Sequence, residues 1–374
     1  MTLPRVRIPF SVLLILLIAM ITATLGLVAY KLANEASNLT ASQHTLSMST
    51  ETLQSIRRML SAARLVTRLT SHSTLTQQED LESRLSQLGF IEEALSESPT
   101  ISAIFIGYAT GDFFLVRVVR DLQHSVSLKL HPDTRLIVQS IEYTDIDQAS
   151  GSAAANVHGR FIYFDKDLKQ ISQTYRPDYA KSYDARTRGW YKSADATSDL
   201  VTSPPYAFFT DGKLGQTLSI KSPDGRSIIG VDISLDTLND IIKSKRITPG
   251  THSAIVNDDG FVIALDYDNN PPVSTSTGNH TPKPNSNAQS AIGSASQTIM
   301  TTPQLKGLRE MDIPIFSSVM SAFHKRDSTK PVLTNFTVDS NVWRTSTSPL
   351  HIEGAAPFYL LIASPDHELL ANAH

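Results

Sequence analysis

The chain has 374 residues, 18% of them charged, and a formal net charge of -3 at pH 7. A chain of this length can bury more than one hydrophobic core, and length alone suggests about two to three domains. The balanced charge gives no sign of a nucleic-acid partner, and the absence of cysteine excludes disulfides and thiolate zinc sites.

The first predicted element is a membrane-spanning helix over residues 8–30. The run "IPFSVLLILLIAMITATLGLVAY" contains no acidic side chain, lysine, arginine or histidine, and about 20 apolar residues suffice to cross the hydrocarbon core. It is longer than the apolar region of a signal peptide, although the small residues around "TAT" leave cleavage open. Arg5 and Arg7 precede the run, so the positive-inside rule places residues 1–7 in the cytoplasm and the chain after Tyr30 outside.

Residues 31–98 are expected to form stalk helices. Leucine and methionine recur at helical spacing in "LQSIRRMLSAARLVTRL", which predicts one long helix to about residue 70. In "STLTQQE", a serine or threonine followed by glutamine and glutamate predicts the start of a second helix. Leu53, Ile56, Leu60 and Leu65 share one broad face, which favours a parallel homodimer through the stalk. The alternative is that this face packs only against the rest of the same chain.

From Ile101 the sequence pattern becomes typical of strands. "ISAIFIGYATGDFFLVRVV", "RFIYFD" with "ISQTYR", and "QTLSIKSPDGRSIIGVDIS" each predict a strand pair, and "ATGD" and "SPDG" predict tight turns. "DTLNDIIKSKRI" predicts a short helix capped by Asp236. Together these segments predict a first α+β module over residues 99–245.

The same pattern restarts after Pro249. "THSAIVNDDGFVIALD" predicts a strand, an Asp-Gly turn and a strand, while "VLTNFTVDSNVWRTSTSPL" and "APFYLLIASP" predict three more strands. Between them, residues 269–300 are rich in Asn, Pro, Ser, Thr and Gly, which predicts a disordered loop. A second α+β module is therefore expected over residues 246–368.

Motifs for catalysis and metal binding are missing from the sequence. The acidic stretch "NDDG" lies between two predicted strands, where a turn is favoured over a metal site. No pair among the 11 histidines has the helical spacing of metal ligands. No Gly-x-Ser-x-Gly elbow and no kinase or cyclase signature is present. We therefore predict no metal, no cofactor and no catalysis by this polypeptide.

The stretch "YDARTRGWY" combines aromatic rings with guanidinium groups. Arg188 offers a planar fork of donors that matches a carboxylate, and Trp190 and Tyr191 could wall a pocket with apolar faces. Further along the chain, Tyr206 and Asp232 add a hydroxyl and an acid. An acid opposite an arginine would bind a zwitterion at both poles. The alternative is an internal salt bridge between Arg188 and Asp232 beside a packed tryptophan.

Several segments resemble a known family. "YDARTRGWYKSA", "VTSPPYAFFTDGKLGQTLSI" and "IIGVDISLDTLNDII" resemble the membrane-distal module of double Cache sensor domains, and "SAIVNDDGFVIA" with "FYLLIASPDHEL" resembles the second module. These are extracytoplasmic receptor domains of bacteria, with a long stalk helix and two PAS-like α/β modules. The resemblance covers roughly residues 31–368. It implies an α+β fold with antiparallel sheets, a small-molecule ligand, and an anchor in the inner membrane with the bulk of the chain in the periplasm.

The resemblance also implies a binding site. In amino-acid-binding members, a tyrosine, an Arg-x-Trp-Tyr, a Tyr-x-Asp and a final aspartate line the pocket. The matching ligand-binding residues here are Tyr183, Arg188, Trp190, Tyr191, Tyr206 and Asp232. Phe208 stands where the pattern has the aspartate of Tyr-x-Asp, so half of the ammonium-binding pair is missing. This departure puts a plain α-amino acid in doubt and leaves open an organic acid, or an amine held by Asp232 alone.

The anchor and "YAFFTDGKLGQTLS" resemble most the sensors that are fused to adenylate or guanylate cyclases. In such receptors the chain re-enters the membrane after the second module, and this sequence stops at "SPDHELLANAH", where that span would be expected. We therefore expect a truncated receptor or a standalone sensor that signals to an output domain outside this sequence. An extracytoplasmic enzyme and a structural membrane-anchored scaffold are the alternatives.

Overall fold

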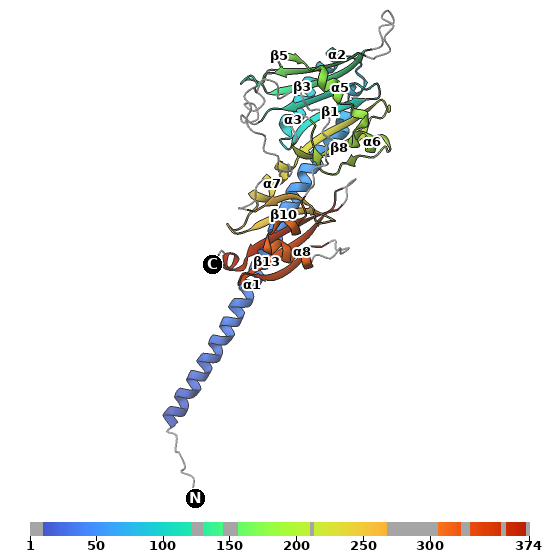
Figure 1. Cartoon of the computed structure of the whole chain (residues 1–374). Helices are drawn as coiled ribbons and strands as arrows, with labels where there is room; N and C mark the ends of the chain where they lie inside the picture. The colour runs from blue at the N-terminus through green and yellow to red at the C-terminus, as the bar shows by residue number, and fades with distance from the viewer. Residues whose placement is uncertain are drawn as a thin grey trace, which may run out of the picture.

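Two antiparallel sheets lie one above the other along a single long helix (Figure 1). The computed structural model describes residues 10–120, 130–144, 156–209, 213–267, 306–322, 330–352 and 357–371. The segment 1–7 and the expected loop 269–300 lie outside the described residues. The expected α+β class with antiparallel sheets is confirmed, whereas the boundaries between the modules stay a prediction.

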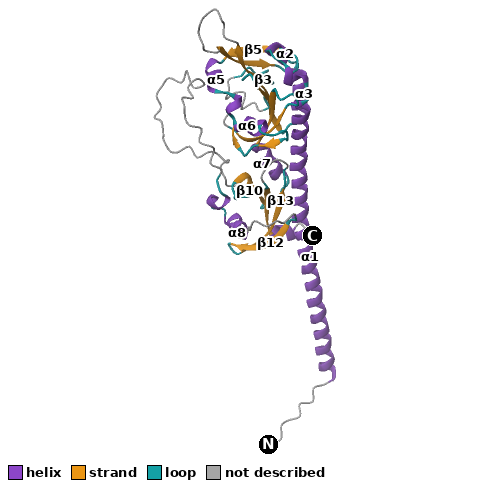
Figure 2. Cartoon of the chain, turned by 90° about the vertical axis from the view of Figure 1, so that its right-hand side faces the viewer, coloured by secondary structure: helices purple, strands orange, loops and turns teal. Residues whose placement is uncertain are grey.

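Helix α1, Phe10–Ser71, joins the apolar N-terminal run to the stalk without a break. Within the part of the chain that the structure describes, α1 is the one helix that is long and apolar enough to cross a membrane. Its first half is exposed, and its second half runs beside both sheets (Figure 2). The helix ends where "TSHSTLTQQED" predicted an interruption.

The second stalk helix begins later than the sequence predicted. Residues Thr74–Gln77 form only a 3-10 turn, and the Ser73 hydroxyl before it donates to the Thr70 carbonyl instead of capping a helix. The cap is Asp80, whose carboxylate accepts from the Ser83 amide at 2.8 Å. Two short helices follow, α2 (Leu81–Leu85) and α3 (Leu88–Glu97).

The first sheet contains all the strand pairs that were predicted before residue 245. Its strands run in the order β5-β4-β3-β2-β1-β9-β8-β6, with β7 also paired to β8. Their bounds are β1 Ile101–Tyr108, β2 Phe113–Val118, β3 Leu136–Thr144, β4 Asn156–Phe164, β5 Gln170–Tyr175, β6 Val201–Thr202, β7 Tyr206–Ala207, β8 Leu214–Lys221 and β9 Ser227–Ser234. Helix α7, Leu235–Ser244, follows β9 and is capped by Ser234, not by Asp236 as predicted.

Alternation along the central strands gives this sheet two different faces. On β1, Ile104 and Ile106 belong to the core that packs around α1, whereas Ala103 and Phe105 belong to a second core on the other face. That second face is covered by α5 (Pro177–Ser182) and α6 (Gly189–Asp195), which lie opposite α1 (Figure 2). The sheet is therefore buried on both sides, and the "YDARTRGWY" stretch lies on the side away from the stalk.

The second sheet is likewise packed on two sides. Its strands run in the order β11-β10-β14-β13-β12, with bounds β10 His252–Asn257, β11 Val262–Asp266, β12 Val332–Val338, β13 Asn341–Leu350 and β14 Phe358–Pro365. Ile255 and Leu360 join the core around α1, while Val256 and Leu361 pack against α8, Pro314–Ala322. The chain ends its described part with α9, Asp366–Ala371.

The stalk face that was predicted to form a dimer packs instead on the same chain. Leu53, Ile56 and Leu60 are buried in the core shared by α1 and the two sheets, whereas Leu65 is 58% exposed. The physical reason is that the sheets each need an apolar cover on one face, and α1 supplies it. The predicted pairing face is therefore wrong for three of its four residues.

Candidate functional site

The floor of the candidate site is one row of side chains across the first sheet. Arg117 on β2 is paired with Ala103 on β1, Ala103 with Asp232 on β9, and Asp232 with Thr217 on β8. Directly opposed residues on antiparallel strands point to the same face, so all four face α5 and α6. Arg117 and Asp232, at the two sides of Ala103, both line the cavity described below.

The segment between α5 and α6 supplies the opposite wall. Arg188 is the residue before the first turn of α6 and has an extended backbone, and its side chain lines the site. Trp190, in the first turn of α6, is buried, and its carbonyl accepts a hydrogen bond from the Ser219 hydroxyl of β8 at 3.0 Å. This bond fixes α6 against the sheet and holds Arg188 and Trp190 at the site.

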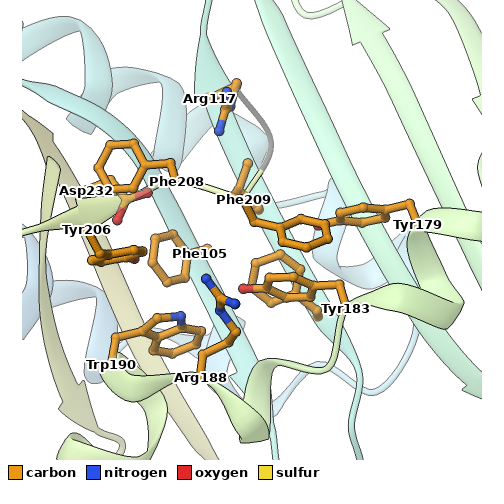
Figure 3. Close-up of a pocket in the computed structure, with 12 residues that line it drawn as sticks. Phe105, Arg117, Tyr179, Tyr183, Arg188, Trp190, Tyr206, Phe208, Phe209 and Asp232 are labelled. Atoms are coloured by element: carbon orange, nitrogen blue, oxygen red, sulfur yellow. The ribbon is translucent and has the colours of Figure 1, made fainter. Parts of the chain in front are cut away.

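A cavity lies between floor and wall (Figure 3). The empty space inside it, part of which is open to solvent, is about 340 Å³, and its enclosed part has room for about one water. A larger ligand therefore requires side chains to shift. The lining residues are Phe105, Phe113, Leu115, Arg117, Tyr179, Tyr183, Arg188, Trp190, Tyr206, Phe208, Phe209 and Asp232.

The acidic end of the cavity is a short hydrogen-bonded chain. The Thr217 hydroxyl donates to Oδ1 of Asp232 at 2.6 Å and lies 2.6 Å from the Tyr206 hydroxyl. Asp232 is buried. Burial, and then the neighbouring Asp232 carboxylate, raise the pKa of Tyr206 well above its usual value, so this phenol stays protonated at neutral pH and keeps a hydroxyl that can donate.

The basic end is a guanidinium group that lies beside a pair of packed aromatic rings. The Arg188 Cζ lies 5.7 Å from the ring centroid of Tyr183 and 5.7 Å from that of Phe209. Planar guanidinium groups pack well on aromatic faces while their N–H edges remain able to donate. Burial raises the pKa of Tyr183, which therefore also stays neutral. In Figure 3, Arg188 and Asp232 project from different sides of the cavity.

Five of the six residues predicted from the sequence line this cavity, and Tyr191 does not. Its ring is buried beside Trp190 and against the backbone of β1, where a side chain at Gly107 would meet it at 3.0 Å. Trp190 and Tyr191 are consecutive on a helix and so point in directions about 100° apart. The shared motif therefore places only one of the two rings at the cavity.

Phe208, the position that departs from the family pattern, is a buried part of the lining. Its ring lies on Gly215 of β8, where an added Cβ would approach within 1.9 Å of it. An apolar ring with this fit occupies the place that an acid takes in the pattern. The cavity is thereby more apolar near Asp232 than the resemblance implied.

Sequence reasoning missed Arg117 and Tyr179, which both line the cavity. Arg117 could have been found from the alternation of "FFLVRVV", because Phe113, Leu115 and Arg117 are two residues apart and share a face. No comparable signal points to Tyr179, since its place depends on how α5 packs. Among the residues that the structure describes, no cluster of histidine, aspartate or glutamate has the arrangement of a metal site.

Part of the chain is similar in sequence to a cyclase and to a chemotaxis protein. No family model matches the chain. Over 172 residues, 46% of this chain and 24% of the relative, it is 26% identical to adenylate cyclase 1 of Rhizobium meliloti. Over 145 residues, 38% of this chain and 23% of the relative, it is 24% identical to the methyl-accepting chemotaxis protein PscA of Pseudomonas syringae.

Among solved structures, the ligand-binding domain of the Pseudomonas fluorescens chemoreceptor CtaA in complex with L-isoleucine aligns with a TM-score of 0.45 and 15% identity. The alignment covers 86% of this chain and 91% of that chain. The chain spans about a quarter of the length of the curated relatives that it matches.

Proposed function

We propose that the chain is a membrane-anchored sensor whose first module binds a small, carboxylate-bearing molecule outside the cytoplasm. The observation that carries this proposal is the position of Arg188, which lies beside the rings of Tyr183 and Phe209 at the wall of a cavity whose far side holds Asp232. A guanidinium group fixed in this way presents a fork of donors to a carboxylate. The aromatic rings around it would enclose the body of the ligand.

Binding without turnover is favoured by the chemistry of the lining. The residues that line the cavity include no histidine, serine, lysine or cysteine, and the Asp232 carboxylate is engaged by Thr217. An enzyme would need a nucleophile or an acid–base pair there. A structural scaffold would have no need of charged groups around a cavity, because burying them costs free energy.

The signal would reach the membrane through α1, which packs on both sheets and continues into the apolar N-terminal run. A homodimer through the stalk is part of this proposal. Because the predicted face of α1 is buried, the dimer would form through its outer face, where Leu65 and Leu69 are exposed. The output domain would be supplied outside this sequence, and a nucleotide cyclase and a chemotaxis transducer are both candidates.

A thermal-shift screen of small metabolites tests the proposed function. With the full chain in detergent micelles, we expect at least one carboxylate to raise the melting temperature, because a ligand that binds only the folded state stabilises it by mass action. Mass spectrometry of the recovered compound should show it unchanged. Conversion of the compound would support the enzyme alternative, and a lack of any shift across carboxylates and amino acids would support the scaffold.

The topology can be tested with reporter fusions after residue 374. We expect alkaline phosphatase, which is active only outside the cytoplasm, to be active there, because Arg5 and Arg7 precede the apolar run and keep the N-terminus inside. A reporter that works only in the cytoplasm should be silent at the same position. Activity of the cytoplasmic reporter would reverse the proposed orientation.

A further inference from the structure

The cavity has a second arginine that no sequence motif assigned. Arg117 projects from β2 on the side opposite Arg188, so that the two guanidinium groups extend into the cavity from different walls (Figure 3). Arg117 is buried, with 7% of its surface exposed. Arg117 and Asp232 are separated by the one strand that carries Ala103, which puts their Cα atoms about 10 Å apart.

A buried arginine does not need to be unpaired to hold a ligand. Its guanidinium group has several N–H donors in a planar fork, and a carboxylate that binds bidentately uses only two of them. An arginine that already donates to a protein group can therefore also donate to a ligand. Two such forks on opposite walls can bind two anionic groups of the same molecule.

The charges of the described lining favour such a ligand. Two guanidinium groups face one carboxylate, and that carboxylate already accepts a hydrogen bond from Thr217. Phe208 places an apolar ring where a second acid would favour an ammonium group. Charge complementarity determines which ligands a site accepts. Here it favours a molecule with two anionic groups over a molecule with one carboxylate.

We propose that Arg117 is a second anion anchor and that the ligand is a short-chain dicarboxylate, with one carboxylate on Arg188 and the other on Arg117. This inference rests on the proposed function, because it requires the cavity to be the binding site. An amine-free diacid and an acidic amino acid share this chemistry. The two ligand types differ in what they place opposite Asp232, because only an acidic amino acid has an ammonium group there.

The test compares matched ligands by isothermal titration calorimetry on the full chain in micelles. Glutarate and valerate have the same chain length and differ in one carboxylate, and succinate and adipate vary the spacing. Glutamate and glutamine repeat the comparison with an amine present. Each ligand is titrated into the unaltered chain, Arg117→Gln and the control Arg226→Gln, in which the arginine is exposed on the turn between β8 and β9.

We expect the better diacid to bind at least about tenfold more tightly than its matched monoacid, because a second charge-assisted contact in a buried site contributes that much or more. Arg117→Gln should remove this preference and leave monoacid affinity within about twofold, while Arg226→Gln changes neither. If the site is built for an acidic amino acid, Asp232→Asn should weaken the binding of glutamate and leave the binding of glutarate unchanged.

Three outcomes would overturn the inference: monoacids that bind as tightly as diacids, an equal loss for both in Arg117→Gln, and no binding of any diacid. If monoacids or neutral amino acids bind and depend on Arg188, the proposed function stands and only the dicarboxylate assignment fails. Melting curves and the variant Arg117→Lys, which keeps the charge, show whether a loss reflects unfolding of the site.

Discussion

Replacing Arg188 by alanine is expected to weaken ligand binding by about a hundredfold or more while the protein stays folded. The guanidinium group lies at the cavity wall beside the rings of Tyr183 and Phe209. Its loss would leave the ligand carboxylate desolvated without its partner, which costs about 2–5 kcal/mol. Titration calorimetry on the full chain measures this directly.

The same variant decides between a ligand anchor and an internal salt bridge. If Arg188 and Asp232 serve only to stabilise the fold, Arg188→Ala and Asp232→Ala should both lower the melting temperature and leave affinity nearly unchanged. Arg188→Lys keeps the charge but loses the bidentate fork, so we expect an intermediate loss of affinity. A large drop in stability with unchanged affinity would contradict the assigned role.

Replacing Arg84 by alanine is expected to destabilise the fold by about 3–5 kcal/mol, because it removes one partner of a buried ion pair. Arg84 is 1% exposed. Its Nη2 donates to Oδ2 of Asp112 at 2.8 Å, and its guanidinium Cζ lies 4.1 Å from the ring centroid of Tyr108. The pair ties α2 to the turn between β1 and β2, and neither residue lines the ligand cavity.

A matched control shows how much of the loss of stability comes from the burial of the ion pair. Arg186 pairs with Asp184 at 2.9 Å with both side chains partly exposed, so Arg186→Ala should cost no more than about 1 kcal/mol. Urea unfolding of the two variants measures the difference. Equal losses of unfolding free energy in the two variants would contradict a stabilising role for the buried Arg84–Asp112 pair. So would a loss below about 1 kcal/mol for Arg84→Ala.

The strands were predictable because their pattern is local. Each predicted strand pair carries its own turn signal or alternation, and "ATGD" forms the expected turn with Gly111 at a φ of 103°. Helix caps were less predictable. A serine or threonine of "STLTQQE" and Asp236 were expected to cap helices, but Asp80 and Ser234 do so, because several residues near each helix start have side chains able to cap.

The site was predicted in part, for a reason that the fold makes clear. Arg188 and Trp190 belong to one continuous motif, and the resemblance places that motif without reference to packing. Tyr191 belongs to the same motif yet lies outside the cavity, and Arg117 lies inside it without belonging to any motif. Both depend on which way a side chain points from its helix or strand, and that direction is set by the sheet and its cover. The same dependence explains why the apolar face of α1 was assigned to a partner chain.

The two tryptophans allow the most direct test of where the ligand binds. Trp190 lines the cavity of the first sheet, and Trp343 lies on β13 of the second. In Trp343→Phe, where Trp190 is the remaining indole, we expect a ligand found by the screen to change the fluorescence emission in a saturable way, at the same midpoint as the calorimetric titration. In Trp190→Phe, emission from Trp343 should stay constant as ligand is added. Saturable binding that leaves Trp190 emission unchanged and alters that of Trp343 would contradict a ligand site in the first module.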